Sequence, residues 1–174
     1  MTGLQLPSAA FFDMDGVLAV YERAMYLPDH TGTPPYMREE LHAFRHCRPD
    51  PVAIGLLRSF LAAGVPVFGL TAIRSDLPWV YYDKIGWLRE HVPELDPSER
   101  LVVASGDKAQ AAMAASRSRA LDKTMLLLDD FNPNLWDWHR AGGTAVKYLN
   151  GLNTPGTSGL KEFDSLPYAA PQNI

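Results

Sequence analysis

The stretch Phe11-Phe12-Asp13-Met14-Asp15-Gly16-Val17-Leu18 carries an apolar run directly into two carboxylates and a glycine. Residues i and i+2 of a strand point the same way, so Asp13 and Asp15 share a face if the strand continues and a neighbourhood if it bends at Gly16. Two acidic groups at the carboxyl end of a buried strand repel each other and lose hydration. A bound cation would make this arrangement tolerable, although Asp-Gly after an apolar run is also a common turn signal.

Three later stretches place polar residues after apolar segments. Leu70-Thr71 ends a second apolar run, Lys108 lies in Ser105-Gly106-Asp107-Lys108, and Asp129-Asp130 follows Met125-Leu126-Leu127-Leu128. Together with the first stretch, they resemble, in the right order, the four motifs of the haloacid dehalogenase-like (HAD) superfamily of phosphohydrolases. The resemblance covers residues 8–147 and implies a Rossmann-like core.

The resemblance implies a role for each motif in the hydrolysis of a phosphate ester. Asp13 would attack phosphorus and become an aspartyl-phosphate, while Asp15 would protonate the leaving oxygen and then activate water. Thr71, with backbone N–H groups of the turn that begins at Ala72, would bind a phosphoryl oxygen. Lys108 would neutralise charge on the nucleophile and the phosphoryl group. The alternatives are a strand-end hydroxyl for Thr71 and a solvated side chain for Lys108.

The resemblance also implies Mg²⁺ as the cofactor. Adjacent residues of a strand point to opposite faces, so Asp129 and Asp130 should not bind one ion equally. Family precedent makes Asp130 a direct ligand, together with the Asp13 carboxylate and the Asp15 carbonyl, while Asp129 acts through water. A few carboxylates, waters and one phosphate oxygen suit the octahedral preference of Mg²⁺.

The composition indicates one soluble domain and says nothing about its chemistry. The 174 residues, 47% hydrophobic and 21% charged, suit a single domain over residues 1–174. A net charge of −4 offers no electrostatic footprint for nucleic acid or an anionic membrane. The single cysteine, Cys47, and first residues that lack a signal-peptide pattern favour a cytoplasmic location.

Apolar runs alternate with helical patterns along the chain. Because the predicted strands are continuously apolar and helices separate them, the sequence predicts a doubly wound parallel α/β sheet. A loop-rich tail is expected from residue 150 to residue 174. The strands are expected at residues 9–12, 65–70, 101–104, 124–128 and 144–146, and the helices at residues 49–63, 78–91 (capped by Ser75 or Asp76), 108–120 and 133–140.

The segment at residues 19–48 resembles the cap that covers the active site in this superfamily, and it is small. A short helix is expected within it, at residues 37–46. Its aromatic side chains could line a base-stacking pocket or pack the cap against the core. They are Tyr21, Tyr26, Tyr36 and Phe44.

Two weaker candidates lie outside the four motifs. Arg74, three residues after Thr71, could contact substrate or be solvated. His42 and His46 have the i, i+4 spacing of a helical zinc site, but no third ligand is evident, so a solvated cap face is favoured.

Within the superfamily, the chain most resembles the cytosolic 5'-nucleotidase and deoxyribonucleotidase group. The implied function is that of a Mg²⁺-dependent phosphomonoesterase acting on a small-molecule phosphate ester, preferably a nucleoside 5'-monophosphate. Three alternatives stay open: a phosphatase of another small metabolite, a polynucleotide 3'-phosphatase and a non-catalytic binding module. Nucleic acid and membrane partners are not expected. A partner subunit can complete a small open cap, so a homodimer also stays open.

Overall fold

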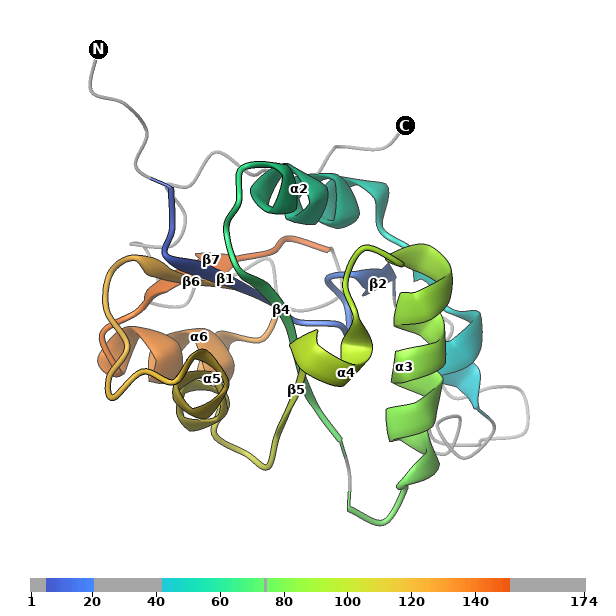
Figure 1. Ribbon diagram of the computed structural model, residues 1–174. Coiled ribbons are helices and arrows are strands. Elements are labelled where there is room, and N and C mark those ends of the chain that lie inside the picture. Colours follow the sequence, from blue (N-terminus) through green and yellow to red (C-terminus); the bar gives the residue numbers. More distant parts are fainter. Residues whose placement is uncertain (1–5, 21–41, 74, 151–174) are drawn as a thin grey trace.

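The computed structural model describes residues 6–20, 42–73 and 75–150. Its main sheet has the strand order β5-β4-β1-β6-β7, and every neighbouring pair is parallel (Figure 1). The predicted parallel α/β fold is confirmed, with the first strand at the centre. The strands are β1 (Ala9–Phe12), β4 (Val67–Ala72), β5 (Leu101–Ala104), β6 (Met125–Asp129) and β7 (Thr144–Lys147).

Helices cover both faces of the sheet because both faces of the strands are apolar. Alternate residues of β1 belong to two separate hydrophobic clusters, one containing Ala10 and Phe12 and the other Ala9 and Phe11. In Figure 1 the helix α2 lies above the sheet, and α5 and α6 lie below it. The helices are α2 (Pro51–Ala62), α3 (Trp79–His91), α4 (Pro97–Arg100), α5 (Lys108–Ser116) and α6 (Asn132–Arg140).

Four of the differences between the predicted and the observed element boundaries have local reasons. The side chain of Asp50 caps α2 by accepting from the N–H groups of Val52 and Ala53, so the helix begins two residues later than expected. β4 continues past Leu70 because Thr71 and Ala72 still pair with β5. Pro78, and neither Ser75 nor Asp76, stands at the N-cap of α3. α5 ends at Ser116, where Arg117 adopts a left-handed conformation with φ of 54°.

The predicted cap is described only at its two ends. β2 (Ala19–Val20) pairs antiparallel with β3 (Arg48–Pro49), and a 3₁₀ helix, η2 (Ala43–His46), lies in the described part of the range predicted to be helical. Phe44 is buried and packs edge-on against Trp87, with ring centroids 6.0 Å apart, so it belongs to the core. None of the described helices is both long and apolar enough to cross a membrane.

Candidate active site

The carboxyl ends of the three central strands bring the predicted motifs together. Asp13 follows β1, Thr71 lies near the end of β4, and Asp129-Asp130 closes β6. The N–H of Asp13 donates to the carbonyl of Leu128 at 2.9 Å, which fixes the first motif beside the last. In parallel α/β sheets, ligands bind at this edge, so the sheet topology alone places the four motifs where a site is expected.

Gly16 is required where the chain turns after β1. Its φ is +75°, in the left-handed region that favours glycine, and a Cβ added there would lie 2.4 Å from Oδ2 of Asp130. The side-chain amide of Asn150 donates to the carbonyl of Gly16 at 2.9 Å and to Oδ2 of Asp130 at 2.6 Å. The turn and the last motif are therefore packed against each other with no space for a side chain.

Lys108 lies between the carboxylates of Asp13 and Asp129. Its Nζ is 2.8 Å from Oδ1 of Asp13 and 2.7 Å from Oδ2 of Asp129, and all three side chains are buried. Burial by itself would lower the pKa of Lys108, but the two carboxylates outweigh it and hold the pKa above its ordinary value. The lysine therefore remains charged, and the alternative of a solvated side chain is wrong.

Burial also perturbs Asp13. It raises the pKa of this carboxyl well above its ordinary value, and the negative charges of Asp129 and Asp15 act in the same direction, while Lys108 opposes them. A carboxylate in this position needs positive charge close by in order to stay ionised. Lys108 provides part of that charge, and a bound cation would provide more.

Asp129 and Asp130 have different surroundings. Asp129 is fully buried; it accepts hydrogen bonds from Lys108, from the N–H of Phe131 at 2.8 Å and from the amide of Asn134 at 3.1 Å. Asp130 has its carbonyl held by the ammonium of Lys147. The carboxylate of Asp129 thus has an ammonium, an amide and a backbone N–H as donors, while the carboxylate of Asp130 accepts from the amide of Asn150 at 2.6 Å.

These carboxylates fit a hard cation. One carboxylate oxygen from each of Asp13, Asp129 and Asp130 lies within 4.8 Å of the other two, and no other such group of three occurs among the described residues. All donors are oxygen atoms, which suit Mg²⁺ rather than the softer transition metals. The donor set thus matches the cofactor that the sequence resemblance implied.

Asp15 and Thr71 meet at a second buried lysine. The hydroxyl of Thr71 donates to Oδ2 of Asp15 at 2.9 Å, and the ammonium of Lys84 donates to the same oxygen at 2.5 Å and to Oγ1 of Thr71 at 2.6 Å. The carbonyl of Ala72 also accepts from Lys84, at 3.2 Å. Thr71 is fully buried, so its hydroxyl serves the acidic side chain of the first motif.

Comparison with solved structures identifies the fold. A HAD-superfamily hydrolase from Ehrlichia chaffeensis matches with a TM-score of 0.50 and 12% identity, over 86% of this chain and 91% of that chain. A HAD hydrolase of family IA, variant 3, from Entamoeba histolytica matches with a TM-score of 0.57 and 14% identity, over 82% and 84%. This is the fold of the HAD hydrolases. No family model and no curated protein matches the sequence.

Sequence reasoning missed Lys84, although the sequence contains a signal for it. The buried residues of α3 recur at helical spacing, and Lys84 occupies a position in that series between Val80 and Trp87. A lysine at a core position of an amphipathic helix must find an anionic partner or remain in water. Nothing in the sequence indicates that this partner is Asp15, because the contact joins residues 69 positions apart.

Four of the predicted substrate contacts are not tested by the structure. Tyr21, Tyr26, Tyr36 and Arg74 lie outside the described residues. His42 is in a left-handed conformation just before η2, and its Nδ1 is 2.9 Å from the carboxylate of Asp83. The zinc alternative for His42 and His46 therefore gains no support, since the buried partner of His42 lies on α3.

Proposed function

We propose that this chain is a Mg²⁺-dependent phosphomonoesterase that forms an aspartyl-phosphate on Asp13. The observation that carries the proposal is the buried cluster of Asp13, Asp129 and Asp130, with a charged lysine bridging two of its members. Asp15 lies two residues from the nucleophile and is held by its own lysine. The fold shared with HAD hydrolases supports the same chemistry by analogy.

The proposed hydrolysis has two steps, the formation and the hydrolysis of an aspartyl-phosphate on Asp13. An oxygen of Asp13 attacks phosphorus, the bond from phosphorus to the ester oxygen breaks, and Asp15 gives its proton to the departing oxygen. Asp15 then takes a proton from water as that water attacks the phosphoryl group, which releases phosphate and restores Asp13. Lys108 lowers the negative charge around the nucleophile in both steps. Mg²⁺, held by Asp13, Asp130 and the Asp15 carbonyl, supplies positive charge toward the phosphoryl oxygens when bound.

The metal ligands are expected to differ in strength. Asp130→Ala should weaken Mg²⁺ binding by more than about 100-fold, whereas Asp129→Ala should weaken it by about 10- to 100-fold, the usual effect of a residue that supports a ligand. The reason is that Lys108, Asn134 and a backbone N–H already occupy the carboxylate of Asp129. Calorimetric titration of Mg²⁺ into both variants measures this without an activity assay. A larger loss in Asp129→Ala would reverse the assignment of the direct ligand.

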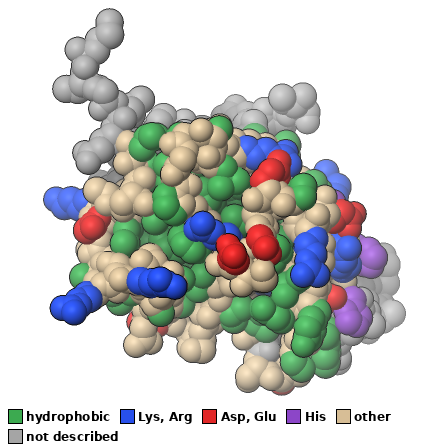
Figure 2. Space-filling view, in the orientation of Figure 1, with side chains coloured by type: hydrophobic (Ala, Val, Ile, Leu, Met, Phe, Trp, Pro, Cys, Tyr) green, Lys and Arg blue, Asp and Glu red, His purple; other side chains and the backbone are tan. Residues whose placement is uncertain are grey.

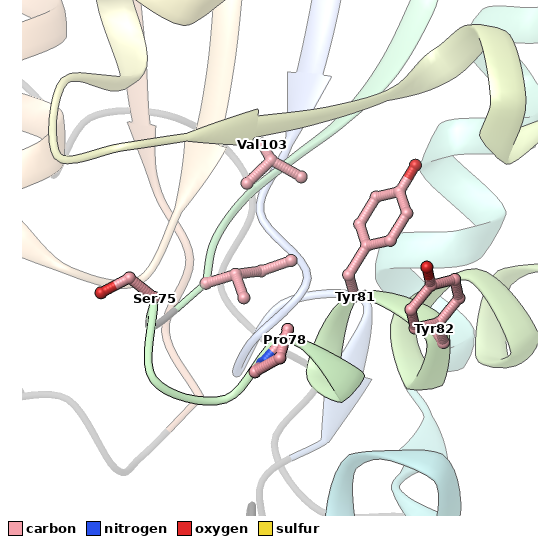
Figure 3. A pocket seen from close by; sticks show the side chains of 6 residues that line it. Ser75, Pro78, Tyr81, Tyr82 and Val103 are labelled. Carbon is pink, nitrogen blue, oxygen red and sulfur yellow. The ribbon is translucent and has the colours of Figure 1, made fainter.

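The preferred substrate that we propose is a nucleoside 5'-monophosphate. A cavity of about 460 Å³ lies between α3, β5 and the loop that follows β4. Figure 3 shows Tyr81 and Tyr82 projecting from α3, with Val103 on the facing strand. Val103 pairs in register with Thr71, which donates to Asp15, so the cavity is one strand away from the acid–base residue. Its aromatic and apolar lining suits a flat ring on the leaving group.

The cavity predicts an effect on nucleotide binding. Tyr82→Ala, which removes a ring that is 70% exposed, should raise KM for the best nucleotide by about 5- to 150-fold, because stacking of one base is worth about 1–3 kcal/mol. KM for ribose 5-phosphate, which has no base, should change by less than about twofold. Tyr82→Phe is the matched control, since it keeps the ring. Equal effects on both substrates would show that Tyr82 holds the structure together and does not bind the base.

A substrate panel tests the proposed function as a whole. It should include nucleoside 5'-monophosphates, sugar phosphates, p-nitrophenyl phosphate and a short oligonucleotide with a 3'-phosphate, each with Mg²⁺ and with EDTA. We expect phosphate release that requires Mg²⁺ and is fastest with a nucleotide. On the face of the molecule shown in Figure 2, Lys and Arg side chains are scattered among acidic ones and form no continuous basic stripe for a nucleic-acid strand. A preference for the oligonucleotide would contradict the proposed nucleotide substrate. A failure to hydrolyse any ester of the panel would contradict the proposed function.

A further inference from the structure

Lys84 is buried as deeply as the core of the protein, yet it lies outside the four motifs. It is 1% exposed, and its ammonium has three acceptors: Oδ2 of Asp15, Oγ1 of Thr71 and the carbonyl of Ala72. An ammonium group has three protons, so these contacts use its donor capacity completely. Burial of an ammonium is costly unless it is fully hydrogen-bonded and paired with a charge. Both conditions are met by residues at the edge of the candidate site.

The three acceptors of Lys84 come from the two segments that must be aligned for catalysis. Asp15 is on the turn after β1, while Thr71 and Ala72 end β4. Lys84 reaches both segments from the middle of α3, a helix that packs on the side of the sheet and carries no motif. Oδ2 of Asp15 then accepts from two donors at once, Lys84 and Thr71. A carboxylate with two donors on one oxygen is fixed in its rotation about the Cβ–Cγ bond.

We propose that Lys84 is a positioning residue that holds the Asp15 carboxyl in the rotation needed for proton transfer. Lys84 and Thr71 both donate to Oδ2, so together they fix the orientation of the whole carboxyl group relative to the turn after β1. Lys84 does not touch the phosphate ester and acts only through Asp15. This inference rests on the proposed function, because it assigns Lys84 a part in the acid and base steps of that reaction.

The proposal predicts a dependence on the leaving group that a purely structural lysine would not produce. An alkyl phosphate needs a proton on its departing oxygen, whereas p-nitrophenolate departs without one. Lys84→Met should therefore lower kcat/KM for an alkyl ester such as glycerol 3-phosphate by about 100-fold or more, the usual contribution of a general acid. For p-nitrophenyl phosphate, kcat/KM should fall by less than about fivefold, because formation of the phosphoenzyme needs little acid catalysis.

The second half of the reaction gives a separate signature. Hydrolysis of the aspartyl-phosphate needs Asp15 as a base whichever ester was used, so it should be slow in Lys84→Met. With p-nitrophenyl phosphate, the variant should release a rapid burst of p-nitrophenol, close to one equivalent per site, before a slow steady state. A stopped-flow trace at enzyme concentrations high enough to see one turnover measures this. A distortion of the whole site would slow both phases and give no burst.

Three further variants complete the test. Lys84→Arg keeps the positive charge and the donors, so it should recover part of the rate with the alkyl ester. Lys84→Gln keeps a donor without charge and replaces Lys84→Met if that variant does not fold, with the same pattern expected at smaller amplitude. Lys123→Met removes an exposed lysine and should behave as the parent chain.

The possible outcomes test the positioning role of Lys84 and the proposed phosphatase function separately. A selective loss with the alkyl ester, together with the burst, supports the positioning role. An equal loss on both esters, or no loss on either, overturns that role while leaving the phosphatase function in place. A parent chain that hydrolyses no ester of the substrate panel with Mg²⁺ overturns the proposed function and, with it, the role of Lys84.

Discussion

Asp13→Asn is expected to abolish turnover and to leave the fold intact. An amide oxygen is a poor nucleophile and a poor ligand for Mg²⁺, so the rate should fall by about a thousandfold or more, as for other enzymes that lose a nucleophile. Stability should not fall, because burial and the charges of Asp129 and Asp15 already disfavour an ionised Asp13, as its raised pKa indicates. The backbone bond from residue 13 to Leu128 does not depend on the side chain.

The measurement is the steady-state rate on the best substrate of the panel, together with a thermal melt. Asp137→Asn is the matched control, since Asp137 is an exposed aspartate on α6. If purified Asp13→Asn kept more than a small fraction of the parent rate, Asp13 could not be the nucleophile. A loss of rate accompanied by a large fall in Tm would show instead that the carboxylate is needed for folding.

Lys108→Met is expected to have the largest effect on stability. It leaves the carboxylates of Asp13 and Asp129 buried without the ammonium that contacts both. Removing one partner of a buried ion pair costs about 3–5 kcal/mol. The free energy of unfolding should fall by about that amount, and activity should be lost as well, because the nucleophile no longer has a neighbouring positive charge.

The pH dependence of this variant has a defined sign. Without Lys108, the pKa of Asp13 should rise further, since the positive charge that lowers it is gone. The protonated form is then the one that the fold tolerates, so the stability deficit relative to the parent should shrink as the pH is lowered and grow as it is raised. Mg²⁺ should also raise the Tm of Lys108→Met, because an ion that binds only the folded state stabilises it.

Thermal melts over a range of pH, with and without Mg²⁺, measure these effects, with Lys123→Met as the control on an exposed lysine. A deficit that is independent of pH would mean that packing, and not charge, is the contribution of Lys108. A Tm equal to that of the parent at neutral pH would contradict the ion pairs that the structure shows.

The central strand and its motifs could be predicted because their signal is local. The run that ends in Asp13-Met14-Asp15-Gly16 is contiguous, and a buried strand before an acidic turn has few alternative structures. Both faces of β1 are apolar, which is the pattern that distinguishes a parallel sheet covered by helices on both faces from an antiparallel sheet with one face in solvent. The alternation of strands with helices then predicted that the strands are parallel, and this places the site at their carboxyl edge.

The residues that support the site could not be predicted, because their partners are far away in sequence. Lys84 and Asn150 contact the turn after β1, and Asn134 and Lys147 hold the last motif. Each of these is a polar residue of a kind that is usually solvated. Only the folded chain shows that they converge on Asp15, Gly16, Asp129 and Asp130.

The inexact boundaries have a similar cause. α5 stops at Arg117, an arginine in the left-handed conformation where glycine would have been the recognisable signal. β4 extends to Ala72 because it pairs with β5, which the local sequence of β4 does not encode. The two-residue strands β2 and β3 are too short to show a period.

The most direct test of the account is a search for the phosphoryl group on Asp13. The chain should be mixed with Mg²⁺ and p-nitrophenyl phosphate, quenched with acid within a turnover, and analysed by mass spectrometry of the intact protein and of its peptides. The account predicts a gain of one phosphoryl group, located on Asp13, that requires Mg²⁺ and is absent from Asp13→Asn. The adduct should also accumulate in Lys84→Met, where its hydrolysis is slow. Phosphate release from this variant without an adduct would contradict the account, and so would an adduct on a residue other than Asp13 in either protein.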